Sequence, residues 1–410
     1  MVLRESDFPG DIRVENEAIA LTEAGHKVFV VCDPMTGRAE HELYKGIQIF
    51  RVPRQQPAIL SKINTLLYFL LLRNYYWQHL LEKLFCLYKF DVFHVHDLPF
   101  TGTVMDLARR LSVPVVFDSH ENYPIGLQYY QKIPAGIPKQ LWPSYIFSLK
   151  RWLRFEKESF QRAAKIIGTV PEMKERIVGL GIPAEKVVVV SNTVNLEQFA
   201  NFSIDPEIIS KYQNRFVISY IGSIVQHRRL DTIIRAMPQI LAEIPQALLL
   251  IVGGVDKRPE FKALIQEKGL NQAVELIGWQ DLSKMPSYIE VSALGVLPQQ
   301  PTEHTSNTIP HKLFQYMYMG KAQVVSNCTA VARIVRESKC GIVCEADLDN
   351  TEAWAEAILA LKDDRLRREM GQRGREAVIS TYNWSVDKQT LISLYESDVL
   401  RRNNKATTQG

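Results

Sequence analysis

The chain has 410 residues, which is too long for one ordinary hydrophobic core and fits two domains of roughly 200 residues each. Hydrophobic residues make up 46% of it and charged residues 23%, which excludes a disordered chain and a fibrous repeat. The formal net charge of +4 is small for this size, and we expect no nucleic-acid partner.

The first half of the chain alternates short β-branched runs with helical segments. Strands are predicted at residues 28–31, 92–95, 115–117 and 187–190, and helices at residues 15–24 and 103–111. Strands that are apolar on both sides suit a parallel sheet covered by helices, so this order predicts a doubly wound α/β domain. A first strand normally precedes the loop at Pro9–Gly10, but the only apolar run before that loop is Met1–Leu3. This indicates either a very short first strand or a chain that starts late.

The same pattern restarts after a predicted domain boundary near residues 192–199. Strands are predicted at residues 216–221, 248–252, 274–277, 293–297, 323–325 and 341–344, a helix at residues 231–244, and helical structure from Trp354 onward. We therefore predict two doubly wound domains, residues 1–194 and 195–384. We expect a C-terminal helix around residues 385–400 to pack back on the first domain.

The five cysteines are scattered and odd in number. No pair of them has the spacing of a structural zinc site, so free thiols in a reducing cytosol are expected and we predict a cytoplasmic protein. The longest apolar run, residues 66–72, is far shorter than the roughly 20 residues that span a bilayer.

The strongest functional motif is the segment 310–321, which follows a polar loop at residues 299–308. A helix beginning there would present unpaired N–H groups and a positive dipole end to an anion, and Lys312 would add a charge. Thr305 and Thr308 supply caps and further donors. On composition alone, an ordinary buried helical crossover with a solvated Lys312 is favoured.

A second motif follows the strand 216–221, where Gly222 permits close approach of a ligand to the backbone. Arg228 and Arg229 come shortly afterwards, and arginines at the carboxyl end of a strand grip phosphate oxygens well. A solvated basic loop is an equally good interpretation for Arg229.

Polar clusters also end two strands of the first half, at residues 94–97 (HVHD) and 118–121 (DSHE). Consecutive parallel strands end at the same edge of a sheet, so both clusters should face one crevice. A zinc site at His94, His96 and His120 is an alternative that we disfavour, because His94 and His96 are expected to diverge along the strand.

Together these motifs resemble the family 4, group 1 retaining glycosyltransferases, which have the GT-B fold of two facing Rossmann-like domains with a deep interdomain cleft. The resemblance covers nearly the whole chain. The motifs that carry it are residues 11–18, 24–28, 91–97, 118–121, the hinge 190–195, residues 220–223 with Arg228, and residues 312–321. Each of them alone is weak, and together they are specific.

The resemblance implies a transfer of sugar from a nucleotide-sugar donor to a lipid-linked or saccharide acceptor, with no metal and no cofactor. His120 would lie beside the transferred sugar as the catalytic residue. The implied donor-binding residues are Gly10 and Gly222 near the diphosphate, Arg228 and Lys312 on it, Trp279 at the base, Asn307 near the sugar, Gln315 at the ribose, and Thr308. The setting would be synthesis of cell-surface polysaccharide or glycolipid.

The donor helix departs from the family pattern at two positions. Members usually carry two glutamates eight residues apart, and this chain has Asn307 and Gln315 there. Gln315 retains hydrogen-bonding groups for ribose hydroxyls, whereas Asn307 supplies no carboxylate. A catalytically weak binding or scaffold protein, and a sugar-nucleotide epimerase on the same scaffold, therefore stay as alternatives.

Residues 59–90 are rich in Leu, Tyr and Trp, with basic residues interleaved. An amphipathic basic helix at a bilayer surface has such a composition, and so does a pair of core helices. Since this segment belongs to the acceptor domain of the resembled fold, we expect peripheral contact with the inner face of the plasma membrane.

Overall fold

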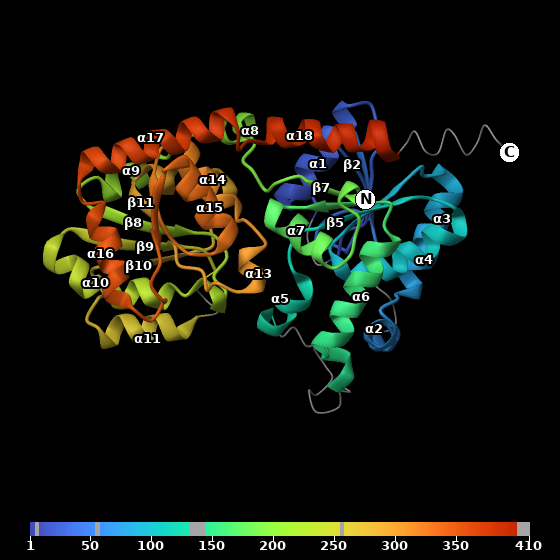
Figure 1. The fold of residues 1–410 in the computed structure, drawn as a ribbon, viewed down its shortest axis with the longest axis horizontal. Coiled ribbons are helices and arrows are strands. Elements are labelled where there is room, and N and C mark those ends of the chain that lie inside the picture. The colour runs from blue at the N-terminus through green and yellow to red at the C-terminus, as the bar shows by residue number, and fades with distance from the viewer. Residues whose placement is uncertain (5–7, 54–57, 131–143, 255–257, 400–410) are drawn as a thin grey trace. The chain divides into compact units, whose positions relative to one another are not determined.

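The computed structural model describes residues 1–4, 8–53, 58–130, 144–254 and 258–399. The chain divides into two compact units, which we call unit 1 (Met1–Ser191 with Asp387–Gly410) and unit 2 (Asn192–Val386). The predicted limits, after residues 194 and 384, lie close to these boundaries. In Figure 1 the strands of each unit lie between layers of helices, as in a doubly wound α/β fold.

Unit 1 contains one sheet in the order β2-β3-β1, then Val2, then β4-β5-β6-β7. Its strands are β1 (Phe29–Cys32), β2 (His41–Tyr44), β3 (Ile47–Arg51), β4 (Phe93–His96), β5 (Val115–Ser119), β6 (Lys165–Gly168) and β7 (Val187–Val189). Val2 bridges Val31 and Val95, so the very short first strand joins the two halves of the sheet. Only β2 is antiparallel to its neighbour among the described strands.

The α-helices of unit 1 include α1 (Ile12–Glu23), α2 (Ala58–Leu71), α3 (Tyr75–Tyr88), α4 (Thr101–Leu111), α5 (Tyr123–Tyr130), α6 (Leu149–Arg162) and α7 (Pro171–Gly179). Short 3-10 turns lie at Leu98–Phe100, Ser144–Phe147 and Ala184–Lys186. Asp11 caps α1 by accepting a hydrogen bond from the N–H of Val14. This cap starts the helix three residues before the predicted position and brings Arg13 into its first turn.

Unit 2 contains a parallel sheet in the order β10-β9-β8-β11-β12-β13. Its strands are β8 (Phe216–Ile221), β9 (Ala247–Val252), β10 (Val274–Gly278), β11 (Ser292–Leu297), β12 (Ala322–Ser326) and β13 (Gly341–Cys344). Since β8 and β9 are buried throughout except for Phe216, they read as continuous apolar runs, and for this reason the sequence located them well.

The α-helices of unit 2 include α8 (Leu196–Ala200), α9 (Pro206–Tyr212), α10 (Leu230–Glu243), α11 (Pro259–Glu267), α12 (Met285–Glu290), α13 (Glu303–Ser306), α14 (His311–Tyr318), α15 (Thr329–Ser338), α16 (Thr351–Ala360) and α17 (Asp364–Ser380). Short 3-10 turns lie at Gln226–Arg228 and Leu282–Lys284. A core of Ile, Leu, Met and Trp side chains from α10, α16 and the sheet strands fills this unit.

The last helix, α18 (Trp384–Ser393), continues as a π-helical turn at Leu394–Val399. From Asp387 onward it belongs to unit 1, where Tyr395 Oη lies 2.7 Å from His94 Nδ1. Lys388 Nζ also lies 2.5 Å from a carboxylate oxygen of Glu23 on α1. These contacts attach the C-terminal helix to unit 1.

The basic segment 59–90 forms two helices in this structure, α2 and α3. The break falls at Leu72, which has a positive φ, and Asn74 caps α3 by accepting from the N–H of Trp77. The segment is therefore a pair of helices and not one continuous amphipathic helix, because Asn74 starts a new helix.

Candidate active site

Polar side chains of unit 1 gather on β4 and at the ends of β4 and β5. The two strands pair in register, with His96 beside Asp118. His94 and His96 lie on one face of β4, since residues two apart in a strand point the same way, and their rings stack with centroids 4.3 Å apart. The prediction that these two side chains diverge is therefore wrong.

Arg13 on α1 binds the buried carboxylate of Asp118 in a bidentate manner. Its Nε and Nη2 atoms donate to the two carboxylate oxygens at 2.9 and 2.7 Å. Its Nη1 atom donates to the carbonyl of Val190 at 2.9 Å. Burial by itself raises the pKa of Asp118, but the charges of Arg13 and His120 outweigh burial and hold that pKa well below its usual value. Arg13 and His120 thus stabilise the buried Asp118 carboxylate in its ionised form.

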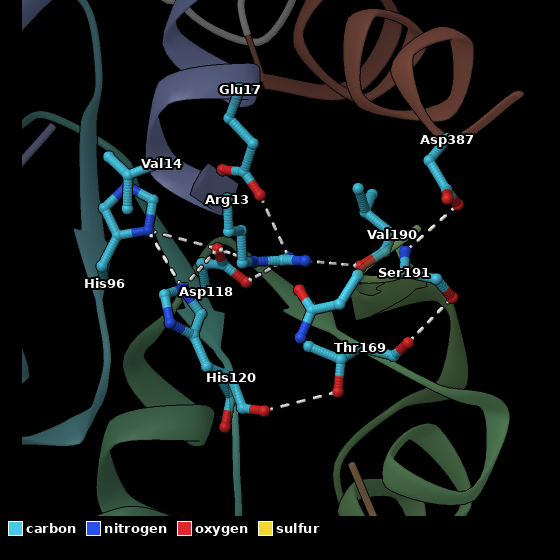
Figure 2. A network of polar contacts seen from close by, with 12 residues as sticks. Arg13, Val14, Glu17, His96, Asp118, His120, Thr169, Val190, Ser191 and Asp387 are labelled. Atoms are coloured by element: carbon cyan, nitrogen blue, oxygen red, sulfur yellow. Dashed lines mark hydrogen bonds and ion pairs between the residues drawn. The ribbon is translucent and has the colours of Figure 1, made fainter. Parts of the chain in front are cut away.

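Glu17 lies one helical turn after Arg13, with the two side chains 3.1 Å apart. Burial raises the pKa of Glu17 well above its usual value, and the charge of Asp118 adds to this effect. Only one of these two buried carboxyl groups is therefore strongly acidic. Figure 2 shows Arg13 between Glu17, Asp118 and Val190.

His120, one residue past β5, lies between two carboxylates. Its Nε2 atom is 2.9 Å from Asp118 Oδ2, and its Nδ1 atom is 3.2 Å from Asp97 Oδ2. Burial by itself lowers the pKa of His120, but the charges of Asp97 and Asp118 outweigh burial and raise that pKa well above its usual value. The two carboxylates therefore favour the protonated form of the imidazole.

Unit 1 contains a group of possible metal ligands that differs in its residues from the zinc site considered above. One ligand atom from each of Glu17, His94, His96 and Asp118 lies within 4.8 Å of the others. Arg13 and His120, however, already bind the Asp118 carboxylate, and two cations there oppose a third. The donor set fits a proton-binding network better than a metal ion.

A second group of predicted residues meets in unit 2, at the carboxyl end of β8. Lys312, in the first turn of α14, is buried, with Nζ 3.6 Å from the centroid of the Tyr220 ring. Its ammonium makes no hydrogen bond within the described part of the chain. Burial, and then the charge of Arg228, lower the pKa of Lys312 well below its usual value.

Gly222 leaves the space that the Lys312 side chain occupies. Its φ of +124° is rarely adopted by residues with a side chain, and a Cβ there would lie 2.7 Å from Lys312 Nζ. Arg228 donates from Nη1 to the side-chain oxygen of Gln299, and its Nε has no hydrogen-bond partner within the described residues. The basic side chains of Lys312 and Arg228 thus lie near the carboxyl end of β8, and among the described residues no carboxylate forms an ion pair with either of them.

A neutral histidine completes this basic group. Burial, and then the charge of Arg228, lower the pKa of His227 to about 3, and its ring packs edge-on against His304 with centroids 5.4 Å apart. Arg229 instead pairs with Asp231 and Asp349 at 3.2 and 2.5 Å. Of the two adjacent arginines, Arg228 therefore lies with Lys312 and Arg229 lies in surface ion pairs.

The other predicted donor-binding residues have varied surroundings. Gln315 and Thr308 are half-buried, and Asn307 donates to the carbonyl of Glu303 at 2.6 Å. The Trp279 side chain is 72% exposed. Gly10 is exposed in unit 1, in the loop before α1.

Sequence reasoning missed three residues that hold these groups. Arg13 and Glu17 lie within residues 11–18, one of the motifs of the family resemblance, but no role was predicted for them, and Gln299 was named only as the start of a polar loop. A signal for Arg13 and Glu17 does exist, because charged residues on a face that must be buried need partners. The partner of Arg13 lies 105 residues away, so the sequence does not name it.

Two family models match this chain. Residues 11–198 match Glycosyltransferase Family 4, and residues 201–377 match Glycosyl transferases group 1. The chain belongs to the group 1, family 4 glycosyltransferases. This family assignment agrees with the two Rossmann-like units and makes the protein a glycosyltransferase.

Known relatives of this glycosyltransferase are distant. An uncharacterized glycosyltransferase of Methanocaldococcus jannaschii is 22% identical over 94% of this chain and 93% of its own length. Another from the same organism is 19% identical over 58% of this chain, and the match spans only 59% of that relative. Both relatives are named as glycosyltransferases, and neither name gives a substrate.

Solved structures share the GT-B fold. Sucrose-phosphate synthase from Thermosynechococcus elongatus is 18% identical with a TM-score of 0.74, covering 99% of this chain and 96% of that one. The Anabaena protein HepE, solved with UDP-glucose, is 13% identical with a TM-score of 0.69, covering 97% and 98%. At these identities the likeness establishes the fold alone.

Proposed function

We propose that this glycosyltransferase moves a sugar from a nucleoside diphosphate sugar to a hydroxyl group of a lipid-linked or saccharide acceptor, with retention at the anomeric carbon. The observation that carries the proposal is the buried side-chain nitrogen of Lys312, which has no hydrogen-bond partner within the described residues. Burial disfavours the protonated form of this amine, and a ligand that supplies negative charge would restore it. A diphosphate between Lys312 and Arg228 would supply this charge.

In the proposed reaction, negative charge develops on the leaving diphosphate. The bond between the anomeric carbon and the diphosphate oxygen breaks, a bond from the acceptor oxygen to that carbon forms on the same face, and the leaving phosphate takes the acceptor proton. Lys312 and Arg228 would stabilise the negative charge that grows on the leaving diphosphate. His120 would lie beside the transferred sugar, and Gly10, Thr308, Asn307 and Trp279 would complete the donor site.

A thermal-shift screen of nucleotide sugars, with and without divalent metal, tests the proposed function. UDP-glucose is the first candidate, because HepE has been solved with that compound. GDP-, ADP- and dTDP-sugars form the rest of the panel. We expect one class of donor to raise the melting temperature without added metal. If none of these donors binds, the protein is no sugar transferase of this kind.

Gln315 offers a first test of the donor site. A carboxylate at this position would bind ribose hydroxyls more strongly, but it would also repel the diphosphate, by about 2 kcal/mol at roughly 8 Å and an effective dielectric near 20. Since these effects are comparable, Gln315→Glu should keep donor affinity and change turnover only modestly. Gln315→Leu should weaken binding, because it strands the ribose hydroxyls.

The Gln315 variants are compared by donor titration in a calorimeter and by steady-state turnover. Should leucine prove as good as glutamate, position 315 makes no contact with the ribose, and a scaffold protein becomes the better interpretation.

We also propose that α2 contacts a membrane surface. Among the described residues, no helix is both long and apolar enough to cross a bilayer. Five apolar side chains of α2 are nevertheless exposed, which suits a helix lying in the interface. They are Ile59 (57%), Leu60 (46%), Ile63 (45%), Leu67 (36%) and Leu71 (48%). Lys62 on the same helix and Lys83 on α3 are exposed as well and would favour anionic lipids.

Vesicle sedimentation tests the membrane proposal. The chain should bind vesicles of phosphatidylglycerol better than vesicles of phosphatidylcholine, and the triple variant Ile59→Ser, Ile63→Ser, Leu67→Ser should lose at least about tenfold in affinity. A matched control changes three exposed apolar residues elsewhere, Leu43, Ile204 and Ile379, to serine. If both triple variants lose the same vesicle affinity, α2 has no particular role in membrane binding.

A further inference from the structure

Arg13 lies in the first turn of α1 and is almost completely buried, with 4% of its side chain exposed. A side chain at this depth is too far inside the unit to bind a substrate. Its Nε and Nη2 atoms donate to the two oxygens of Asp118, and the oxygen that accepts from Nε is also the one 2.9 Å from His120 Nε2. Arg13 and His120 therefore meet at one oxygen atom of the same carboxylate.

The guanidinium group of Arg13 is fixed by contacts at all three of its nitrogen atoms. Besides the two bonds to Asp118, Nη1 donates to the carbonyl of Val190 at 2.9 Å. Val190 is itself held by β6, because its N–H donates to the carbonyl of Gly168 at 3.0 Å. A carboxylate oxygen of Glu17 lies 3.1 Å from Nη2. Since a guanidinium is rigid and planar, these contacts set both its position and its orientation.

The carboxylate of Asp118 depends on Arg13 for its orientation. Strand β5 fixes the main chain of Asp118, but rotation of a carboxylate about its last bond has broad energy minima. Contacts from His96 Nδ1 at 3.2 Å and His94 Nε2 at 3.9 Å both go to Oδ2, so they define one atom and not a plane. The two parallel N–H groups of Arg13 engage both oxygens and thereby set the plane of the carboxylate.

The main chain of His120 is attached to the same segment as Arg13. Thr169 Oγ1 donates to the carbonyl of His120 at 3.4 Å, and the carbonyl of Thr169 accepts a hydrogen bond from Ser191 Oγ at 2.8 Å (Figure 2). Ser191 directly follows Val190, whose carbonyl binds Arg13. Residues 190–191 therefore hold both the main chain of His120 and, through Arg13, the carboxylate that its ring faces.

We propose that Arg13 is a positioning residue for sugar transfer, which sets the orientation of the Asp118 carboxylate and, through it, the ring of His120. The inference rests on the proposed function, in which His120 lies beside the transferred sugar. A small displacement of that ring would lower turnover, while the nucleotide site in unit 2 would be unaffected. The position requires arginine and not positive charge alone, because the ammonium of a lysine is a point charge that does not fix the plane of a carboxylate.

The experiment uses the full chain and compares two Arg13 variants with a matched control. Arg13→Met removes the charge as well as the two parallel donors, and it can prevent folding because the buried Asp118 loses its partner. Arg13→Lys keeps the charge and removes only the parallel donors, so this variant carries the test. The control is Arg176→Lys. Arg176 donates to both oxygens of the buried Glu156 at 3.1 and 2.5 Å, in a pair that includes neither Asp118 nor His120.

Steady-state kinetics with the nucleotide sugar of largest thermal shift should show kcat lowered about tenfold or more in Arg13→Lys. The donor KM and the affinity for the free nucleotide should stay within about twofold of the natural chain. In NMR spectra of the free protein, the proton on His120 Nε2 should give a downfield, slowly exchanging signal, because it faces the buried Asp118. Arg13→Lys should broaden or lose this signal, and Arg176→Lys should keep both the signal and kcat.

A kcat of Arg13→Lys within about twofold of that of Arg176→Lys would overturn the inference, and so would an unchanged His120 signal in Arg13→Lys. A loss of nucleotide affinity as large as the loss of kcat would also overturn it, because the change would then act on the nucleotide site. If the natural chain transfers sugar from no donor, the proposed function has failed. The NMR comparison needs no substrate, so it still shows whether Arg13 orients His120.

Discussion

Replacing His120 by alanine should abolish sugar transfer while affinity for the free nucleotide stays nearly unchanged. His120 lies between the carboxylates of Asp97 and Asp118, which favour its protonated form, in the unit that we propose contacts the transferred sugar. Interactions made mainly in the transition state lower turnover without affecting nucleotide binding. A loss of at least about a hundredfold in kcat is expected for a group of this kind.

The control for this variant is His79→Ala, which removes an exposed histidine of α3. Full activity in His120→Ala would show that the residue is only structural. Loss of a bound metal from that variant would instead support the zinc alternative at His94, His96 and His120.

A second readout uses stability. The pKa of His120 is raised in the folded chain, so the folded state binds its proton more tightly than the unfolded state does. The resulting stabilisation is fully present below about pH 6.5, the unfolded value, and is lost as the pH rises through the folded pKa. The free energy of unfolding of the natural chain, relative to His120→Ala, should therefore fall with rising pH over that window. Urea unfolding at a series of pH values measures this.

Replacing Lys312 by methionine should weaken donor binding by about 1.5–3 kcal/mol, which is the usual value of a hydrogen bond to a charged group. The same change should leave the free protein at least as stable, because it removes a buried amine that has no hydrogen-bond partner in the described residues. Opposite effects on binding and stability are typical of a residue retained for its ligand. Nucleotide titration and thermal unfolding measure the two effects.

Proton uptake on donor binding shows whether the Lys312 side chain itself contacts the diphosphate. A general effect of losing one positive charge would not produce it. Its pKa is lowered in the free protein, and a bound diphosphate should raise it. Donor binding at mildly alkaline pH should therefore take up protons, which calorimetry in buffers of different ionisation enthalpy detects. Lys312→Met should lose this uptake, Arg228→Ala should weaken binding, and the exposed Lys284→Met should do neither. Equal donor affinity in the Lys312 and Arg228 variants and the natural chain would place the diphosphate elsewhere.

Strand prediction succeeded or failed according to burial. The strands β8 and β9 are covered on both faces, so they appear as apolar runs that are easily recognised. The antiparallel β2 is exposed or half-buried along its length and contains both polar and apolar residues. In β3, buried residues alternate with half-buried ones. Neither strand was predicted. The fully buried β6 was also missed, because Lys165 begins it and Gly168 ends it, and neither is typical of a strand.

The sequence by itself determined the two doubly wound domains, the family, and the positions of Lys312, Arg228, Gly222 and His120 next to strand or helix ends. These features depend on periodicity and on residues close together in the chain, where local physical preferences act. They also include the departure at Gln315, which is visible without coordinates.

Only the tertiary structure decided which of these residues meet. Arg13 reaches Asp118 across 105 residues, and Tyr395 reaches His94 across 301. The charge state of His120, its contact with Asp97 and the unsatisfied side-chain nitrogen of Lys312 all depend on such distant contacts. A pKa and a missing hydrogen bond are properties of the surroundings of a group, and chain folding brings those surroundings together from segments that the sequence keeps apart.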